Sequence, residues 1–284
     1  MNRLLFLSLS LSSSSSLSLP LLSSRLLSSS TSKSVLIHGD ALDSSIYKKL
    51  FVNSSAPKPN ILMTDPPYCI LTRRRVLGDL RDVKKRKRKL DDEETVTRFE
   101  NIKSYIQFTK LWLENVISNC LSNSPTLIIW TNPLGKKHLK DLIENDFGFL
   151  FIGEYIWAKR TDHKSSSSNN STKEVTLRVY ETALVFKKEK NDNIDNNKMF
   201  SWSVITGYHD ENETTRHEHP CHKPFKAIEP LVLNFTKPGD TIIDPFMGSG
   251  GILYCAQKIG NRNIYGIEKL DIWKNYCDQL LNDE

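Results

Sequence analysis

The stretch TIIDPFMGSG, residues 241–250, decides the fold. A turn at residues 237–240 leads into an apolar run of strand length that ends at Asp244, and a glycine-rich turn follows. We expect a helix from about Ile252. The glycines at 248 and 250 remove side chains where a backbone must approach a ligand closely. A strand, an acidic residue, a glycine turn and a helix in this order predict an α/β fold that binds a nucleotide-type cofactor.

The next strand extends this cofactor site. The run NIYGI at residues 263–267 precedes Glu268, which follows the glycines by about 20 residues. A carboxylate at that distance can accept hydrogen bonds from both hydroxyls of a ribose. A dinucleotide-dependent oxidoreductase would show a similar pattern, so this half of the chain leaves more than one enzyme class open.

The run ILMTDPPY at residues 61–68 favours a group transfer to nitrogen. An exocyclic amino group of a nucleobase is a poor nucleophile, so a catalyst must draw on its hydrogens and hold it in line with an electrophile. Asp65 and the carbonyl of Pro66 supply two acceptors, Pro67 helps to fix their direction, and Tyr68 can stack on the base. Asp65 would lie at the carboxyl end of a strand, where open α/β sheets bind ligands. The alternative is a plain strand-to-turn junction, because proline pairs are common in turns.

In combination, these motifs resemble the S-adenosylmethionine-dependent DNA methylase N-4/N-6 family, the amino-methyltransferases of adenine N6 and cytosine N4. The resemblance runs from about Leu36 to the C-terminus, in the family's beta-type motif order. Four further segments support it, namely IHGDA at 37–41, YIWAK at 155–159, YETALVFK at 180–187 and HPCHKP at 219–224. The resemblance implies a Rossmann-like methyltransferase fold with a circularly permuted motif order, in which a mixed, mostly parallel sheet has helices on both faces.

The family also implies a cofactor and a set of site residues. The cofactor is S-adenosyl-L-methionine. The catalytic residues are Asp65, Pro66, Pro67 and Tyr68. Asp40 would lie near the adenine of the cofactor, and the segment containing Lys223 and Pro224 would pack on its methionine part. The full set of expected cofactor-binding residues is Asp40, Lys223, Pro224, Asp244, Phe246, Gly248, Ser249, Gly250 and Glu268.

The sequence departs from the family pattern in two places. Gly251-Ile252 replaces a Thr-Thr pair after the glycine turn, which leaves the helix start without a hydroxyl cap. Cys221-His222 replaces a Thr-Gln pair, and with His217 and His219 it gives a density of possible zinc ligands. These donors are crowded into one short segment with no second pair elsewhere, so we expect no metal site. Cys69 lies beside the catalytic run, but direct transfer needs no covalent intermediate.

A basic segment follows the catalytic run, in a loop expected over residues 69–98. Cations attached directly to a base-binding pocket are well placed to contact phosphates. The alternatives are a solvated charged loop and a nuclear-import signal. The expected phosphate-binding residues are Arg73, Arg74, Arg75, Lys84, Lys85, Arg86, Lys87 and Arg88.

The remaining chain predicts one catalytic domain over residues 34–284 with flexible insertions at 160–173 and 190–198. Residues 1–33 are rich in serine and leucine and contain basic but no acidic residues, which is typical of a disordered peptide that targets a mitochondrion or chloroplast. A secretory signal is the alternative for this segment, and the basic run leaves the nucleus open. The five cysteines are odd in number and scattered, so we expect a reducing compartment. No later run reaches the ~20 apolar residues of a membrane span.

The sequence thus predicts a methyltransferase that acts on the exocyclic amine of a nucleobase in DNA. Adenine N6 comes before cytosine N4, because Asp at the head of the catalytic run resembles the adenine members. The alternatives are an RNA base methyltransferase, an inactive nucleic-acid-binding relative and a protein glutamine methyltransferase. The expected partner is nucleic acid, with the protein as a monomer or homodimer.

Overall fold

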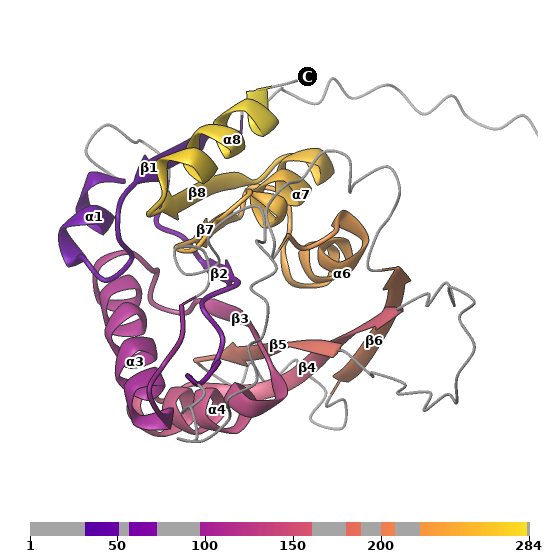
Figure 1. Cartoon of the computed structure of the whole chain (residues 1–284). Helices are drawn as coiled ribbons and strands as arrows, with labels where there is room; N and C mark the ends of the chain where they lie inside the picture. The colour runs from indigo at the N-terminus through magenta and orange to yellow at the C-terminus, as the bar shows by residue number, and fades with distance from the viewer. Residues whose placement is uncertain are drawn as a thin grey trace, which may run out of the picture. The chain divides into compact units, whose positions relative to one another are not determined.

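The structure, a computed structural model, describes residues 32–50, 57–72, 97–160, 180–188, 200–207 and 222–282. These residues form an eight-stranded sheet in the order β1-β8-β7-β2-β3-β5-β4-β6 (Figure 1). The strands are β1 (Ser34–His38), β2 (Ile61–Thr64), β3 (Thr126–Thr131), β4 (Leu150–Arg160), β5 (Tyr180–Lys187), β6 (Phe200–Gly207), β7 (Thr241–Asp244) and β8 (Asn263–Glu268).

The five strands from β1 to β3 in the sheet order are parallel to one another. β5 then pairs antiparallel with both β3 and β4, and β6 is parallel to β4. β2, β3 and β7 are buried along their whole length, which explains why they are nearly continuous apolar runs. The sheet is therefore mixed and mostly parallel, as the resemblance implies.

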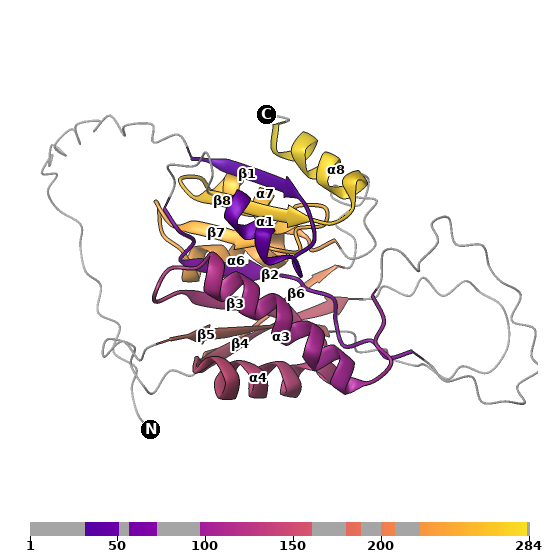
Figure 2. The same cartoon turned by 90° about the vertical axis from the view of Figure 1, so that its left-hand side faces the viewer.

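Helices cover both faces of the sheet. They are α1 (Ser44–Lys49), α3 (Ile102–Asn119), α4 (Pro133–Phe147), α6 (Phe225–Phe235), α7 (Gly251–Ile259) and α8 (Asp271–Asn282). α1, α3 and α4 share one hydrophobic core with the sheet, and Figure 2 shows them in front of it. α6, α7 and α8 share the other core. The predicted arrangement of helices on both faces is confirmed.

Local signals explain where the helices begin and end. Asn101 and Asn132 cap α3 and α4 by accepting a hydrogen bond from a backbone N–H of the first turn. Gly148, with φ of 68°, ends α4 in the left-handed conformation that favours glycine. Apolar residues at helical intervals predict a helix over residues 102–121, and α3 ends two residues earlier, at Asn119. Trp112 and Trp130 are fully buried, one in each of the two hydrophobic cores.

Some elements were not expected from the sequence, and some predictions concern other parts of the chain. The unexpected elements are α1, α4, α6, α8 and β6. Residues 1–31, most of the basic loop, the insertion expected at 160–173 except Arg160, and the insertion expected at 190–198 lie outside the described residues. Among the residues that the structure describes, none of the helices is long and apolar enough to cross a membrane.

Candidate active site

The site lies at the carboxyl edge of the parallel strands. Asp65 directly follows β2, Asp244 ends its neighbour β7, and Glu268 ends β8. The Oγ1 of Thr64 donates a hydrogen bond of 2.7 Å to Oδ1 of Asp244. The catalytic run and the glycine turn are thus joined directly, although they are far apart in the sequence. Carboxyl edges of this kind are where open α/β sheets bind ligands.

The two carboxylate oxygens of Asp65 differ in their hydrogen bonding. Its Oδ2 accepts a hydrogen bond of 2.5 Å from Nζ of Lys223, and its side chain is 15% exposed. Its Oδ1 is buried and has no hydrogen-bond partner among the described residues. A buried acceptor without a donor costs about 1–3 kcal/mol, so a donor on a ligand would be favoured here. The ion pair with Lys223 was not expected from the sequence, and it leaves Oδ1 available.

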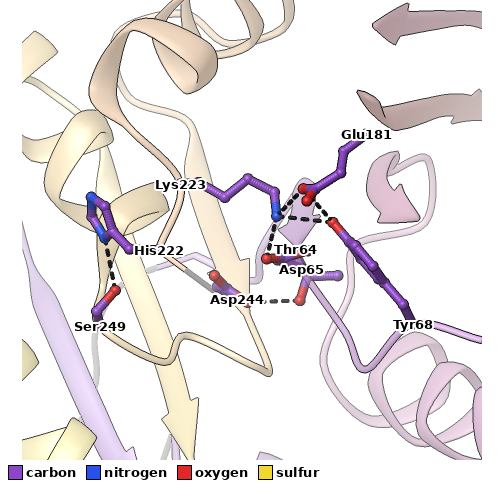
Figure 3. A network of polar contacts seen from close by, with 8 residues as sticks. All are labelled: Thr64, Asp65, Tyr68, Glu181, His222, Lys223, Asp244 and Ser249. Atoms are coloured by element: carbon purple, nitrogen blue, oxygen red, sulfur yellow. Dashed lines mark hydrogen bonds and ion pairs between the residues drawn. The ribbon is translucent and has the colours of Figure 1, made fainter. Parts of the chain in front are cut away.

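Lys223 lies at the centre of a polar network (Figure 3). Its side chain is 5% exposed, and its ammonium contacts three oxygens, which are Asp65 Oδ2, Glu181 Oε2 at 2.8 Å and the Tyr68 hydroxyl at 2.9 Å. Burial lowers the pKa of Lys223, but the two carboxylates outweigh this effect and raise the pKa above its ordinary value. The resemblance assigned Lys223 to the cofactor site, whereas the structure brings its amine to the catalytic run.

Glu181 is a site residue that no motif in the sequence indicates. It lies near the start of β5, opposite Trp157 of β4, and its side chain is 14% exposed. Because β5 runs antiparallel to β3, its beginning reaches the edge where the parallel strands end. The only signal in the sequence is a carboxylate at the start of an otherwise apolar strand, which does not by itself indicate a site.

Tyr68 reaches the same network through its hydroxyl. The hydroxyl donates a hydrogen bond of 2.9 Å to Oε2 of Glu181 and accepts one from Lys223. Burial, followed by the charges of Asp65 and Glu181, raises the pKa of Tyr68 well above its ordinary value. The half-buried ring packs against the core that contains α6 and α7. Pro66, beside it, is buried and Pro67 half-buried. Stacking of Tyr68 on a base stays a prediction.

The glycine turn is held by Glu268. Gly248, with φ of 51°, donates its N–H to Glu268 Oε2 at 2.9 Å, and the N–H of Leu270 donates to Oε1 at 2.9 Å. Burial raises the pKa of Glu268, and these N–H groups oppose that rise without cancelling it. Each oxygen accepts one of these backbone bonds and retains further acceptor capacity, which fits a pair of ribose hydroxyls.

Gly250 meets a packing requirement. Its φ of 80° is left-handed, and a Cβ at this position would lie 2.3 Å from Sγ of Cys277 in α8. The residue is therefore needed for α8 to pack on the turn, in addition to its predicted role at the cofactor. α7 begins one residue before the expected Ile252 and has no side-chain cap, as the missing Thr-Thr pair predicts.

The other expected cofactor residues surround this turn. The Oδ1 of Asp40, just after β1, accepts the N–H of Leu42, and its Oδ2 pairs with Lys269 at 2.8 Å. Ser249 is buried, and its hydroxyl lies 2.9 Å from Nδ1 of His222. Pro224 precedes α6. The segment before α6 therefore contacts the glycine turn through His222.

Phe246 points away from that contact, into the core on the α3 face. Its ring packs edge-on against Trp112, with the ring centroids 5.3 Å apart. This position makes Phe246 a packing residue of the turn. Cys69 is also buried, and burial raises the pKa of its thiol, which opposes its use as a nucleophile.

Two predictions fall partly or wholly outside the described residues. His217, His219 and Cys221 lie there, and within the described ranges no three metal-ligating side chains cluster together. All eight expected phosphate-binding cations lie there as well. The structure does describe the residues that flank the basic segment. There, Leu71 forms a β-bridge with Phe99, and the N–H of Thr72 donates to the carbonyl of Phe99 at 2.8 Å. The basic segment thus begins and ends beside the catalytic run.

The raised pKa of Asp244 predicts that the free energy of unfolding depends on pH. Burial raises its pKa from 3.8 to about 7, although Thr64 and the N–H of Phe246 donate to it. Between these two pH values the unfolded chain releases the proton and the folded chain retains it, so stability falls as pH rises and levels off above the folded pKa. We expect Asp244→Asn, whose amide oxygen can accept both bonds, to gain stability over the wild type by on the order of 2–4 kcal/mol across this window.

Urea unfolding at about pH 4 and about pH 8 measures this difference between the two proteins. Asp278→Asn, in the partly exposed pair with Lys274 on α8, is the matched control and should show a smaller change. An equal gain for Asp244→Asn at both pH values would contradict the buried, raised carboxyl.

Known proteins resemble this chain in sequence and in fold. Type II methyltransferase M.HinfI of Haemophilus influenzae is 24% identical over 238 residues, which cover 79% of this chain. The chain spans 63% of the length of that relative. The complex of M1.HpyAVI with SAM has a TM-score of 0.56 at 20% identity, covering 87% of this chain and 98% of the other. The cytosine-N4-specific PvuII DNA methyltransferase has a TM-score of 0.56 at 14% identity, covering 89% and 94%.

The family model described as DNA methylase matches residues 60–281, well over half of the chain. The match contains the catalytic run, the glycine turn and Glu268. S-adenosyl-L-methionine is the cofactor of this family, as the sequence predicts. The Rossmann-like fold shared with the structural relatives agrees with the match. The chain therefore belongs to the N6/N4 DNA methylase family.

Proposed function

We propose that this protein transfers a methyl group from S-adenosyl-L-methionine to the exocyclic amino group of a base in DNA, with adenine N6 as the first target and cytosine N4 as the second. The observation that carries the proposal is Oδ1 of Asp65. It is a buried acceptor with no partner among the described residues, at the end of a strand that is paired directly with the strand of the glycine turn.

The residues around the turn fit the cofactor. Glu268 is a carboxylate held in place by backbone N–H groups and retains acceptor capacity for ribose hydroxyls. When bound, S-adenosyl-L-methionine supplies a methyl group on a positively charged sulfur. Burial raises the pKa values of Asp65, Asp244 and Glu268, so a cationic ligand beside them would stabilise their charged forms.

Asp65 would act on the amine through hydrogen bonding. Its Oδ1 accepts an N–H of the base and the Pro66 carbonyl accepts another, which concentrates the lone pair on nitrogen. That lone pair would form the new nitrogen–carbon bond, and the cofactor would supply the methyl group by giving up its carbon–sulfur bond, with the electron pair left on sulfur. The nitrogen then loses a proton toward Asp65. No covalent enzyme intermediate is needed.

The base must reach Asp65 from outside the duplex. A paired amino group is inaccessible to such a pocket, so the target nucleotide has to leave the stack. Oδ1 of Asp65 is buried, so neighbouring side chains must move when a base enters. Tyr68, beside it, is the aromatic residue that we expect to stack on the base.

The choice of adenine rests on Asp65 at the head of the catalytic run. The relatives do not separate the two bases, because the PvuII enzyme is cytosine-N4-specific and has the same fold. The test is incubation of the protein with tritiated S-adenosyl-L-methionine and, in parallel, unmethylated bacterial DNA, ribosomal RNA and total protein. Mass spectrometry of the nucleosides then names the base.

Label in N6-methyladenine of DNA, lost in Asp65→Asn, supports the proposal. Label in N4-methylcytosine corrects the base, and label in RNA corrects the polymer. Label confined to protein glutamine, or cofactor binding with no transfer to any of the three, overturns it. The second of these outcomes would identify an inactive binding relative.

The basic segment gives a prediction about DNA affinity. Both of its ends lie beside the catalytic run, so its cations would contact phosphates that flank the target base. We expect replacement of Lys84, Lys85, Arg86, Lys87 and Arg88 by glutamine to weaken binding of every DNA sequence equally. The slope of log affinity against log salt should fall by about 0.9 for each phosphate that the variant no longer neutralises, as measured by fluorescence anisotropy.

A control variant with Lys136, Lys137 and Lys140 of α4 replaced by glutamine removes surface charge elsewhere and should leave the slope nearly unchanged. An unchanged slope after the first replacement would favour a solvated loop or an import signal for the basic segment.

We further propose that residues 1–33 direct the protein to a mitochondrion or chloroplast, since they contain basic residues and no acidic one. A fusion of this segment to a fluorescent protein tests the proposal in cells. Nuclear fluorescence of the full chain, lost when residues 84–89 are neutralised, would point to the nucleus instead.

A further inference from the structure

Lys223 is shared between two carboxylates from different parts of the fold. Asp65 follows β2 and Glu181 is the second residue of β5, and the ammonium of Lys223 contacts the two carboxylates at 2.5 Å and 2.8 Å. Its third contact is the Tyr68 hydroxyl. An ammonium has three donors, and three oxygens receive them here. All three N–H donors of Lys223 therefore bind to Asp65, Tyr68 and Glu181, and none remains for a cofactor or a phosphate.

The packing around the ammonium holds it in this place. Its Nζ lies 5.1 Å from the ring centroid of Trp130 and 6.0 Å from that of Trp157, both of which are buried. Aromatic faces attract cations, more strongly where water is excluded. Lys223 thus has a fixed position, and through it so does Oδ2 of Asp65.

We propose that Lys223 and Glu181 are positioning residues that act on Asp65 as a pair. Lys223 binds Oδ2, so that Oδ1 alone is presented to the target amine. Glu181 shares the charge of the lysine, so that Asp65 remains a strong hydrogen-bond acceptor. This inference rests on the proposed function and gives Lys223 and Glu181 a role at Asp65 that the resemblance did not assign to them.

The charges explain why both members are needed. With Lys223 alone, Asp65 would face an undivided positive charge and would be a weaker acceptor. With Glu181 alone, two buried carboxylates would face each other, and one would hold a proton. With all three groups ionised, the set has one net negative charge. Burial, followed by Glu181, raises the pKa of Asp65, and Lys223 lowers it, with a net rise.

The charged and titratable groups around Asp65 in the described residues are few. They are Tyr68 on the same segment, Lys223 before α6, Glu181 on β5 and Asp244 on β7. Asp244 also titrates near neutral pH, so a pH–rate profile alone would not assign a limb to Asp65. The experiment therefore needs a probe of the Asp65 carboxyl itself.

The first measurement is the pH dependence of single-turnover methyl transfer to unmethylated bacterial DNA. Glu181→Gln keeps the shape of the side chain and an acceptor for Tyr68, so we expect the acid limb to move down by about one pH unit and the rate to fall about tenfold. Lys223→Met should move the limb up by about one unit or more, with loss at neutral pH and recovery in base.

The opposite directions distinguish a charge effect from a structural one, because damage to packing would lower the rate without moving the limb in either direction. Cofactor affinity, measured by calorimetry with S-adenosyl-L-methionine, should stay unchanged in Glu181→Gln. If Lys223→Met does not fold, the isosteric Glu181→Gln decides the question.

The second measurement does not depend on turnover. Carbon-13 NMR of carboxyl-labelled aspartate, with the Asp65 signal assigned by its absence in Asp65→Asn, gives the titration of Asp65 directly. It should move in the same opposite directions in the two variants. Glu154→Gln is the matched control, because Glu154 lies on β4 and pairs with Lys136 of α4, on the other face of the sheet.

An Asp65 titration that is unchanged in Glu181→Gln, or that shifts equally in Glu154→Gln, overturns the inference whether or not the protein is active. If the wild type transfers no methyl group but Asp65 titrates as expected, the proposed function fails and the electrostatic pairing stands. The two failures are thus distinguishable.

Discussion

Asp65→Ala is expected to reduce the rate of methyl transfer by about 10³-fold and to leave the affinity for S-adenosyl-L-methionine unchanged. The substitution removes the acceptor that the amine needs, on Oδ1, and also Oδ2, which binds Lys223. The protein should still fold, because Lys223 and Glu181 remain as a neutral pair at 2.8 Å. Tritium transfer under single-turnover conditions measures the rate, and calorimetry measures the affinity.

The control is Asp65→Asn, which preserves the size of the side chain. Its amide cannot accept hydrogen bonds on both sides at once, from Lys223 and from the base. A loss similar to that of Asp65→Ala would therefore identify the second acceptor as the missing group. Full activity in either variant would exclude Asp65 from the reaction.

Glu268→Ala should weaken the binding of S-adenosyl-L-methionine by about 10²-fold, because a hydrogen bond to a charged group contributes about 1.5–3 kcal/mol and the carboxylate would accept from two hydroxyls. The substitution also leaves the N–H groups of Gly248 and Leu270 without their acceptors, which should lower stability. Calorimetry gives the affinity, and urea unfolding of the same preparation separates the two effects.

Glu268→Gln is the intermediate case. One of its two polar groups is still an acceptor, so the affinity should lie between those of the wild type and Glu268→Ala. At saturating cofactor, the rate of transfer should recover in both Glu268 variants but not in Asp65→Ala. An affinity unchanged in Glu268→Ala would exclude the ribose assignment.

The Asp65 and Glu268 variants test two separate roles, transfer of the methyl group and binding of the cofactor, which the strand order assigns to neighbouring parts of one edge of the sheet. Asp65 directly follows β2, and Glu268 ends β8, two strands away across β7. The carboxyl ends of parallel strands lie at one edge of the sheet, so residues from opposite ends of the chain face one ligand-binding region. The permuted order of the motifs in the sequence does not matter to this arrangement.

The strands and the glycine turn of this site could be predicted, because each depends on residues that are adjacent in the sequence. Buried parallel strands are continuous apolar runs bounded by turns, and β2 and β7 have the predicted form. The glycine turn is also local, since the left-handed φ values of Gly248 and Gly250 require glycine. The family match and the fold confirm these predictions.

The network at Asp65 could not be predicted in the same way. Lys223 and Glu181 come from segments separated by more than a hundred residues from the catalytic run, and neither has a local pattern that indicates a catalytic neighbour. Their meeting depends on the antiparallel insertion of β5 next to β3 and on the path of the chain into α6.

The sequence by itself determined the strands, the glycine turn, the family and the carboxylate at position 65, because each depends on residues adjacent in the chain. Only the tertiary structure decided which charges surround that carboxylate and which of its oxygens remains without a partner. The reason is physical. The acceptor strength of a buried group depends on desolvation and on charges within a few ångströms, and those neighbours are brought together by the order and direction of the strands.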